Sequence, residues 1–194
     1  FQKGLVLARG PQIMSGYLGK QSDSKKVLDA DGWFNTGDLG MLLADGSLVL
    51  TGRSKDTIVL SSGENIEPGP LEECLVSNPI IEQLMLVGQD QKQLGALVVP
   101  KLDNLRDFAL TRGIEIQDSI EQFIENIELK RLVKAEINNM LSVRRSSRPD
   151  ERVAGAAFVS PFTIENGLLT QTLKQRRDKI TERDFQAIAD IFDF

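Results

Sequence analysis

The chain has 194 residues and a formal net charge of −5, with 41% hydrophobic and 26% charged residues. These values are typical of a globular protein with one ordinary domain or two small ones, and an acidic chain is poorly suited to a phosphate backbone, so we expect no nucleic-acid partner. The absence of histidine excludes Ser-His-Asp triads, Cys-His dyads and most zinc sites, and the single cysteine, Cys74, excludes an internal disulfide.

The N-terminal segment lacks an initiator methionine and enters an apolar run almost at once. Residues 5–8 predict a short buried strand, which Gly10 and Pro11 end, and residues 12–30 predict a loop with a short helix. Because the sequence opens on what reads as the middle of a strand, we expect the chain to be a fragment of a longer protein.

The next stretch combines turns rich in glycine and aspartate with a strand pattern. The pair Asp45-Gly46 favours a hairpin turn, and the β-favouring run 47–51 follows it directly. A second apolar run, 57–60, comes after a polar joint at 52–56. We therefore expect two hairpins connected by this charged joint.

Helical and strand patterns alternate after the second hairpin. Residues 68–77 predict a helix with prolines in its first turn, where backbone N–H groups have no intrahelical partner. Two β-branched runs, 81–87 and 94–99, predict two strands of one sheet. A short helix should follow, capped by Asp103 or Asn104.

The longest predicted helix covers residues 118–143, where Asp118 and Glu121 resemble a capping box. Residues 156–160 predict another strand, and Thr181 is expected to cap a final amphipathic helix. We therefore expect an α+β fold in which strands and turns come first and a few-stranded sheet flanked by helices follows.

Asp38 and Arg53 are the first candidates for a functional role. A Gly-Asp turn can present a carboxylate to a vicinal diol such as a ribose, although an Asp that caps its own turn is commoner. The guanidinium of Arg53 can grip a ribose or a phosphate, or it can belong to a solvated charged turn. Each residue taken alone leaves both interpretations open.

Lys174 is the third candidate, in a segment rich in glycine and threonine. A lysine on such a turn can reach into a cleft and stabilise the charge of a phosphate or carboxylate in a transition state. The same residues could also form the basic start of a helix, and this signal is weak by itself.

Together, and in this order, these segments resemble the signature of the adenylate-forming superfamily, which contains acyl-CoA synthetases, luciferases and the adenylation domains of peptide synthetases. Within it, the sequence is most similar to long-chain fatty acid CoA ligases and to the cyanobacterial and plastid acyl–acyl carrier protein synthetases. The resemblance covers essentially the whole chain, and the segments that carry it are 10–17, 31–40, 52–56, 61–68, 161–164 and 168–177.

The resemblance implies a role for five residues. Asp38 and Arg53 would contact the ribose of ATP, and Lys55 would be the hinge between two domains. Gly63 would line the tunnel for the pantetheine of the acceptor, and Lys174 would be the lysine of the adenylation step. No residue of this chain is expected to be a metal ligand.

The resemblance also divides the chain. Residues 1–54 would be the β-rich tail of a large N-terminal adenylation domain, and residues 55–194 would be the mobile C-terminal domain. The phosphate loop, the fatty-acid tunnel and most ligands of Mg²⁺ would lie upstream of Phe1, so we expect the fragment alone to be inactive.

The implied reaction joins a long-chain fatty acid to the thiol of CoA or of acyl carrier protein, using ATP. One alternative is the same chemistry on another carboxylic acid. A second is a non-catalytic module in which a basic rim docks acyl carrier protein, the phosphate of CoA or an anionic membrane surface; the rim residues would be Arg144, Arg145, Arg148, Arg176, Arg177 and Lys179. We expect a cytoplasmic protein, peripheral on a membrane in the docking case, because one cysteine suits a reducing compartment and no apolar run reaches the roughly 20 residues of a spanning helix.

Overall fold

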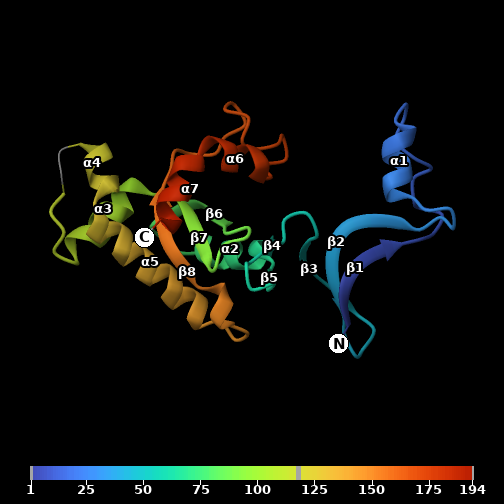
Figure 1. The fold of residues 1–194 in the computed structure, drawn as a ribbon, viewed down its shortest axis with the longest axis horizontal. Helices are drawn as coiled ribbons and strands as arrows, with labels where there is room; N and C mark the ends of the chain where they lie inside the picture. Colours follow the sequence, from blue (N-terminus) through green and yellow to red (C-terminus); the bar gives the residue numbers. More distant parts are fainter. Residues whose placement is uncertain (1, 117–118, 194) are drawn as a thin grey trace. The chain divides into compact units, whose positions relative to one another are not determined.

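The structure is a computed structural model that describes residues 2–116 and 119–193. It has the predicted α+β class, and it divides into two compact units, Phe1–Thr57 and Ile58–Phe194 (Figure 1). Among the described residues, no helix is both long enough and apolar enough to cross a membrane.

The first unit is a three-stranded antiparallel sheet with one short helix. The strands lie in the order β1-β2-β3, with β2 in the centre. The elements of this unit are β1 (Gln2–Ala8), α1 (Gln21–Val27), β2 (Phe34–Leu42) and β3 (Leu48–Arg53).

The hairpin between β2 and β3 confirms the turn predicted at Asp45-Gly46. Gly46 has φ 83, a left-handed conformation that glycine adopts without steric cost. Ser47 donates from its hydroxyl and from its backbone N–H to the Asp45 carboxylate, which lowers the pKa of that carboxyl below its ordinary value. The turn therefore sets the pairs from Gly40–Leu50 to Leu42–Leu48, and a register shift between Leu39 and Gly40 then places Asp38 opposite Arg53.

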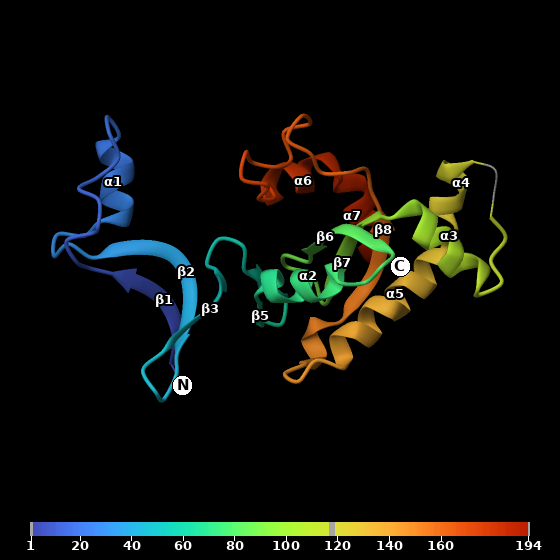
Figure 2. The same ribbon diagram turned by 180° about the vertical axis from the view of Figure 1, so that it is seen from behind.

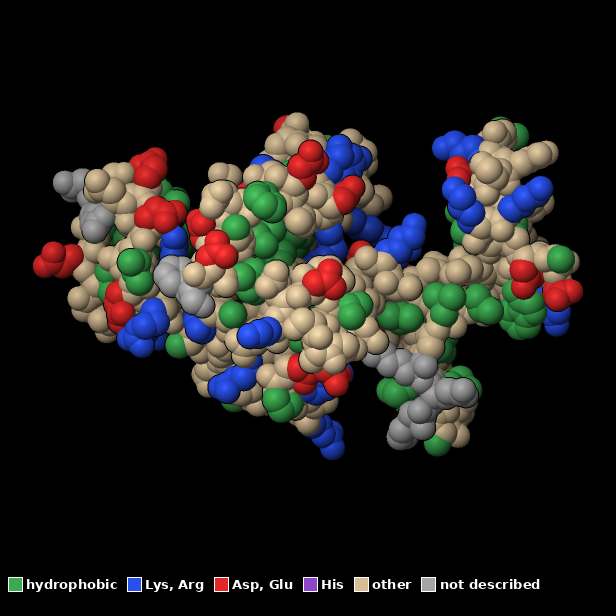
Figure 3. Space-filling model, viewed as in Figure 1, with side chains coloured by type: hydrophobic (Ala, Val, Ile, Leu, Met, Phe, Trp, Pro, Cys, Tyr) green, Lys and Arg blue, Asp and Glu red, His purple; other side chains and the backbone are tan. Residues whose placement is uncertain are grey.

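The strand predicted at residues 5–8 forms, but the expectation that it is buried is wrong. Leu5 is 43% exposed and Leu7 is 48% exposed. The unit offers only α1 as a second layer, and one helix of seven residues cannot cover the sheet. Figure 3 shows hydrophobic side chains on the surface of this unit.

The second unit begins with a two-stranded hairpin and continues into a three-stranded sheet in the order β6-β7-β8. Strands β6 and β7 are antiparallel, whereas β7 and β8 are parallel. The elements of this unit are β4 (Ile58–Val59), β5 (Asn65–Ile66), α2 (Pro68–Val76), β6 (Ile81–Val87), β7 (Leu94–Pro100), α3 (Leu102–Leu110), α4 (Ile120–Glu125), α5 (Ile127–Ser142), the 3-10 turn η1 (Pro149–Glu151), β8 (Val153–Phe158), α6 (Arg177–Arg183) and α7 (Phe185–Phe192).

The three-stranded sheet separates two hydrophobic clusters, because successive strand side chains point to opposite faces. Leu84 and Leu86 of β6 pack with α2, α3 and α5, whereas Met85 and Val87 pack with α6 and α7. Figure 2 shows α2 and α5 on one side of this sheet and α6 and α7 on the other. Burial on both faces explains why β7 and the second half of β6 are continuous apolar runs.

Two details of the predicted helices are wrong, and a third lies outside the described residues. The long helix is broken at Asn126, whose side chain accepts a hydrogen bond from Leu129 N–H and so caps α5. Asn competes for the backbone in this way, which favours caps over helix interiors. Asp118 lies outside the described residues, and Ser119 caps α4 instead. Thr181 lies within α6 and does not begin a helix.

The cap predicted for the short helix is also wrong. Helix α3 begins at Leu102 after Lys101, whose side chain makes no capping hydrogen bond. Asp103 lies in the first turn, where a carboxylate interacts favourably with the positive end of the helix dipole. Asn104 donates to the carbonyl of Pro79, so it ties the helix to the loop between α2 and β6.

Gly95 is the point at which α7 packs against β7. A Cβ atom there would lie 2.8 Å from Cγ2 of Ile191 and 3.0 Å from Cζ of Phe192. We expect Gly95→Ala to lower the free energy of unfolding by about 1–3 kcal/mol, because an extra carbon in a packed contact forces its neighbours to move. Urea unfolding measures this, and the loss should shrink in an Ile191→Ala background, where the clashing methyl is gone.

Candidate functional site

Asp38 and Arg53 lie opposite each other in the antiparallel pair β2–β3. Nε of Arg53 donates to Oδ1 of Asp38 at 3.1 Å, and both side chains are partly exposed. The second carboxylate oxygen accepts no hydrogen bond from a described residue. The pair therefore presents a carboxylate and a guanidinium side by side, each with hydrogen-bonding capacity left over.

The turn before Asp38 is closed by other side chains. Oδ1 of Asn35 accepts from Gly37 N–H at 2.9 Å, and Oγ1 of Thr36 accepts from Asp38 N–H at 3.1 Å. Gly37 has φ 72, which glycine adopts freely. The Asp38 carboxylate is thus not used to cap its own turn, and it is paired with Arg53 instead.

A hollow of about 770 Å³ lies beside this pair, within the first unit. Gly37, Arg53 and Lys55 line one part of it, and Tyr17 and Lys20 line another. The cationic side chains around this open space are donors of the kind that bind a phosphate, and the Asp38 carboxylate, which does not line the hollow, is linked to it through Arg53. The cationic lining therefore fits a phosphate.

The sequence analysis did not identify two lysines near the hollow, one just before α1 and one within it. Lys20 and Lys26 line the hollow, and Lys26 also pairs with Asp23 at 2.9 Å. Figure 3 shows Lys and Arg side chains gathered around this helix. Lys20, Asp23 and Val27 have the spacing of one helix face, and this spacing could have indicated that they line the same space.

Lys55 lies in the turn that follows β3. Asp56 N–H donates to the Arg53 carbonyl at 3.1 Å, which places Lys55 at the third position of a four-residue turn. Its side chain is exposed. The division between the two compact units follows at Thr57 and Ile58.

Gly63 lies at the tip of the β4–β5 hairpin. Its N–H donates to the Leu60 carbonyl at 2.8 Å, and its φ is 85. A Cβ atom at this position would meet nothing within 4 Å, so the surroundings of Gly63 are open. The tip can therefore approach a narrow ligand through its backbone.

Lys174 lies on a small hairpin closed by an isolated bridge between Leu169 and Gln175. Thr170 N–H donates to the Lys174 carbonyl, and Leu173 N–H donates to the Thr170 carbonyl, both at 2.9 Å. The Lys174 side chain is exposed and makes no ion pair with a described residue. Because α6 begins only at Arg177, Lys174 is not the start of a helix.

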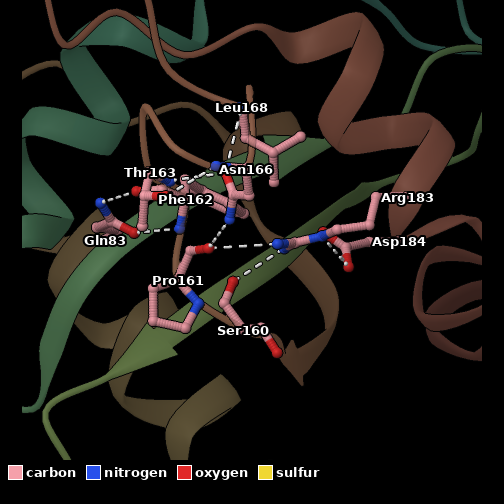
Figure 4. A network of polar contacts seen from close by, with 9 residues as sticks. All are labelled: Gln83, Ser160, Pro161, Phe162, Thr163, Asn166, Leu168, Arg183 and Asp184. Carbon is pink, nitrogen blue, oxygen red and sulfur yellow. Dashed lines mark hydrogen bonds and ion pairs between the residues drawn. The ribbon is translucent and has the colours of Figure 1, made fainter.

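The beginning of the loop that leads to Lys174 is held by side chains from two elements (Figure 4). Gln83 of β6 exchanges hydrogen bonds of 2.9 and 2.8 Å with the backbone of Phe162. Arg183 of α6 donates to the Ser160 carbonyl at 2.9 Å and lies over the Phe162 ring. These contacts fix the loop at its base and leave its hairpin at the surface.

The five residues are thus distributed over both units. The structure brings Asp38 and Arg53 into direct contact, and it places Lys55 in the turn that follows them. Gly63 and Lys174 lie on separate loops of the second unit. Among residues 2–116 and 119–193, no group of three or more His, Cys, Asp or Glu side chains is arranged to hold a metal ion.

Comparison with known families gives a match over residues 55–153 to the AMP-binding enzyme C-terminal domain. The chain belongs to this family. The resemblance to the adenylate-forming superfamily is thereby confirmed, and it rests on about half of the residues.

Relatives with curated names extend the similarity to nearly the whole chain. A probable acyl-activating enzyme from the chloroplast of Arabidopsis thaliana is 39% identical over 93% of this chain, and a chloroplastic long-chain-fatty-acid–[acyl-carrier-protein] ligase from the same plant is 37% identical over 98%. The human long-chain-fatty-acid–CoA ligase 1 is 33% identical over 98%. The chain spans only about a quarter of each relative, at 26%, 25% and 27%.

Solved structures share the fold at low sequence identity. The A domain of a carboxylic acid reductase from Segniliparus rugosus, in complex with AMP and a carboxylic acid, has a TM-score of 0.82 at 23% identity over 98% of this chain and 28% of that chain. The o-succinylbenzoate CoA synthetase of Bacillus subtilis has a TM-score of 0.65 at 21% identity over 93% of this chain and 30% of that chain. At such identities the likeness concerns the fold.

Proposed function

We propose that this chain is the C-terminal part of an ATP-dependent ligase that joins a long-chain fatty acid to a thiol. Residues 1–54 would be the tail of the adenylation domain, and residues 55–194 would be its mobile C-terminal domain. The observation that carries the proposal is the Asp38–Arg53 pair, whose arginine lines a hollow together with Lys20, Lys26 and Lys55. The names of the relatives support a long-chain fatty acid as the substrate, and CoA or acyl carrier protein as the carrier of the acceptor thiol.

In the first half-reaction, a carboxylate oxygen of the fatty acid attacks the α-phosphorus of ATP. The bond from that phosphorus to the bridging oxygen of the β-phosphate breaks, and pyrophosphate leaves with the bonding electrons. Asp38 would accept hydrogen bonds from the ribose hydroxyls, and Arg53 would orient Asp38 and contact the same sugar. Lys174 would stabilise the charge on the reacting groups by its position.

In the second half-reaction, the thiol of CoA or of the phosphopantetheine of acyl carrier protein attacks the acyl carbon. The bond from that carbon to the phosphate oxygen breaks, AMP leaves, and the thiol loses its proton. Rotation at Lys55 would withdraw Lys174 and bring the Gly63 hairpin to the acceptor. Gly63 suits this role because its open tip can approach the narrow pantetheine arm. Mg²⁺, bound by residues outside this chain, would supply charge neutralisation of the phosphates.

The proposal is tested by fatty-acid-dependent ATP–pyrophosphate exchange in the complete protein. We expect exchange in the wild type, and we expect Asp38→Asn to raise the KM for ATP about 10- to 100-fold, because a hydrogen bond to a charged group contributes about 1.5–3 kcal/mol. Asp31→Asn, on an exposed loop, is the matched control. No exchange with any fatty acid would refute the proposal, and an unchanged KM in Asp38→Asn would remove Asp38 from the ribose site.

Two further experiments on the complete protein would identify the carboxylic acid substrate and the acceptor thiol. A panel of fatty, medium-chain and aryl acids in the exchange assay would separate the proposed long-chain substrate from another carboxylic acid. Thioester formation with CoA and with acyl carrier protein, each supplied alone, would identify the thiol.

The alternative of a non-catalytic docking module is less well supported. Of the basic rim residues, Arg144 and Arg148 are tied to carboxylates of the η1 turn, and Arg177 is tied to Glu72. Arg145, Arg176 and Lys179 are the exposed members. Binding of acyl carrier protein to this chain that weakens with salt would support docking, because exposed charges are screened. Cytoplasmic location and peripheral membrane contact stay predictions.

A further inference from the structure

Arg177, three positions after Lys174, makes a partly buried fork with an acidic side chain of another helix. Its Nη1 lies 2.8 and 3.1 Å from the two carboxylate oxygens of Glu72, on α2. Its Nη2 donates to the carbonyl of Leu86, on β6. The same carboxylate accepts from Leu86 N–H at 2.7 Å. The two side chains are only 20% and 14% exposed.

This fork occupies the free edge of the sheet. Strand β6 is an edge strand, and the backbone groups of such a strand need partners other than a neighbouring strand. Glu72 and Arg177 together satisfy both backbone groups of Leu86, and Nε2 of Gln175 donates to the Leu84 carbonyl at 3.0 Å. The residues immediately after Lys174 are therefore attached to β6 by side chains.

The Lys174 hairpin is fixed at both of its ends. Before its tip, Leu168 is buried and its carbonyl accepts from Arg176 N–H, and after its tip Gln175 and Arg177 bind β6. Leu173 at the tip has φ 59, a left-handed conformation that is strained for a residue with a Cβ atom. Leu173 is also exposed, so burial does not compensate for this strain. Strained residues persist where the surrounding structure determines their conformation, and here the contacts of Gln175 and Arg177 lie nearest to Leu173 in the sequence.

We infer that Glu72 and Arg177 are positioning residues that hold the Lys174 hairpin in place for the first half-reaction. The inference rests on the proposed function in one respect, namely the role of Lys174. A buried ion pair is weak evidence for stability, because desolvation offsets much of the attraction between the charges. We therefore assign this pair the role of holding the hairpin in one arrangement. Glu72 stands on the helix that follows the Gly63 hairpin, so the pair also ties the two proposed functional loops into one body.

The pair Arg131–Glu128 on α5 is a natural comparison. It too is a forked arginine–glutamate contact, with distances of 2.8 and 2.6 Å, but its side chains are 66% and 53% exposed. Exposed pairs of this kind contribute little. Arg131→Met therefore removes the same chemical contact from a place where it positions nothing.

Amide hydrogen exchange in the 194-residue chain tests the positioning directly. Arg177→Lys keeps the charge opposite Glu72 but replaces the planar fork by a single ammonium group. We expect the amides of Thr170, Leu173 and Arg176 to exchange at least about tenfold faster, with those of β7 unchanged, because the hairpin opens locally. Arg131→Met should change neither set. Equal acceleration of the hairpin and of β7, or no acceleration of the hairpin, would overturn the inference.

The complete protein tests the consequence for catalysis. We expect Arg177→Lys to lower ATP–pyrophosphate exchange about 10- to 100-fold, as displacement of a catalytic group by about 1 Å can do. Thioester formation from supplied acyl-AMP should stay within about threefold of wild type, and a parallel loss of both rates would contradict the assigned role. If the wild type shows no exchange at all, the proposed function fails, whereas the amide exchange still decides whether the pair positions the hairpin.

Discussion

In the complete protein, Lys174→Ala should abolish most of the adenylation activity and spare the transfer of a preformed acyl group. We expect ATP–pyrophosphate exchange to fall at least about 10²- to 10³-fold, the usual effect of removing one preorganised group that stabilises a transition state. The ammonium is exposed on a surface hairpin, so the substitution should not disturb the fold. Conversion of supplied acyl-AMP to the thioester should remain within about threefold of wild type.

Two control measurements show whether the loss of activity is specific to Lys174. Lys179→Ala removes the same charge from an exposed position of α6 and should leave ATP–pyrophosphate exchange unchanged, since this half-reaction does not involve the acceptor. The thermal midpoint of Lys174→Ala should match that of wild type. Equal loss of exchange and of thioester formation would remove Lys174 from its proposed place in the first half-reaction.

The strands β6 and β7 could be predicted from local sequence, because each contains an apolar run with β-branched residues, and the structure confirms both. Burial on both faces of the sheet is the physical reason for these runs. The ends of the helices were harder to predict from the sequence. Asn126 and Ser119 cap their helices through single side-chain hydrogen bonds, and such bonds compete closely with continued helical periodicity.

The candidate site likewise has one contact that local sequence could indicate and one that depends on tertiary packing. That Asp38 and Arg53 lie near each other could have been deduced from the Asp45-Gly46 turn, but their pairing also depends on a register shift between Leu39 and Gly40. The contact between Glu72 and Arg177 could not have been deduced, because 105 positions separate them and no local pattern relates α2 to the segment after Lys174. Only the packing of both segments on the edge of β6 brings them together.

Lys55→Pro in the complete protein should impair thioester formation more than adenylation. Proline fixes φ near −65°, and at the third position of a four-residue turn it also restricts the residue before it, here Ser54. A joint that must change its backbone conformation between two half-reactions cannot do so with this φ locked. We expect thioester formation from supplied acyl-AMP to fall at least about tenfold further than ATP–pyrophosphate exchange, a difference of about 1.4 kcal/mol in activation free energy.

Lys55→Ala is the matched control, since it removes the charge and keeps the rotational freedom of the backbone. It should leave the ratio of the two rates within about threefold of wild type, because the exposed Lys55 side chain makes no ion pair with a described residue. In the 194-residue chain, both variants should unfold at the wild-type urea midpoint, because the turn lies at the boundary of two units that each have their own internal contacts. An unchanged rate ratio in Lys55→Pro would mean that the domain rotation occurs at another residue. An equal shift in Lys55→Ala would mean that the ammonium, and not the backbone, is what the second half-reaction requires.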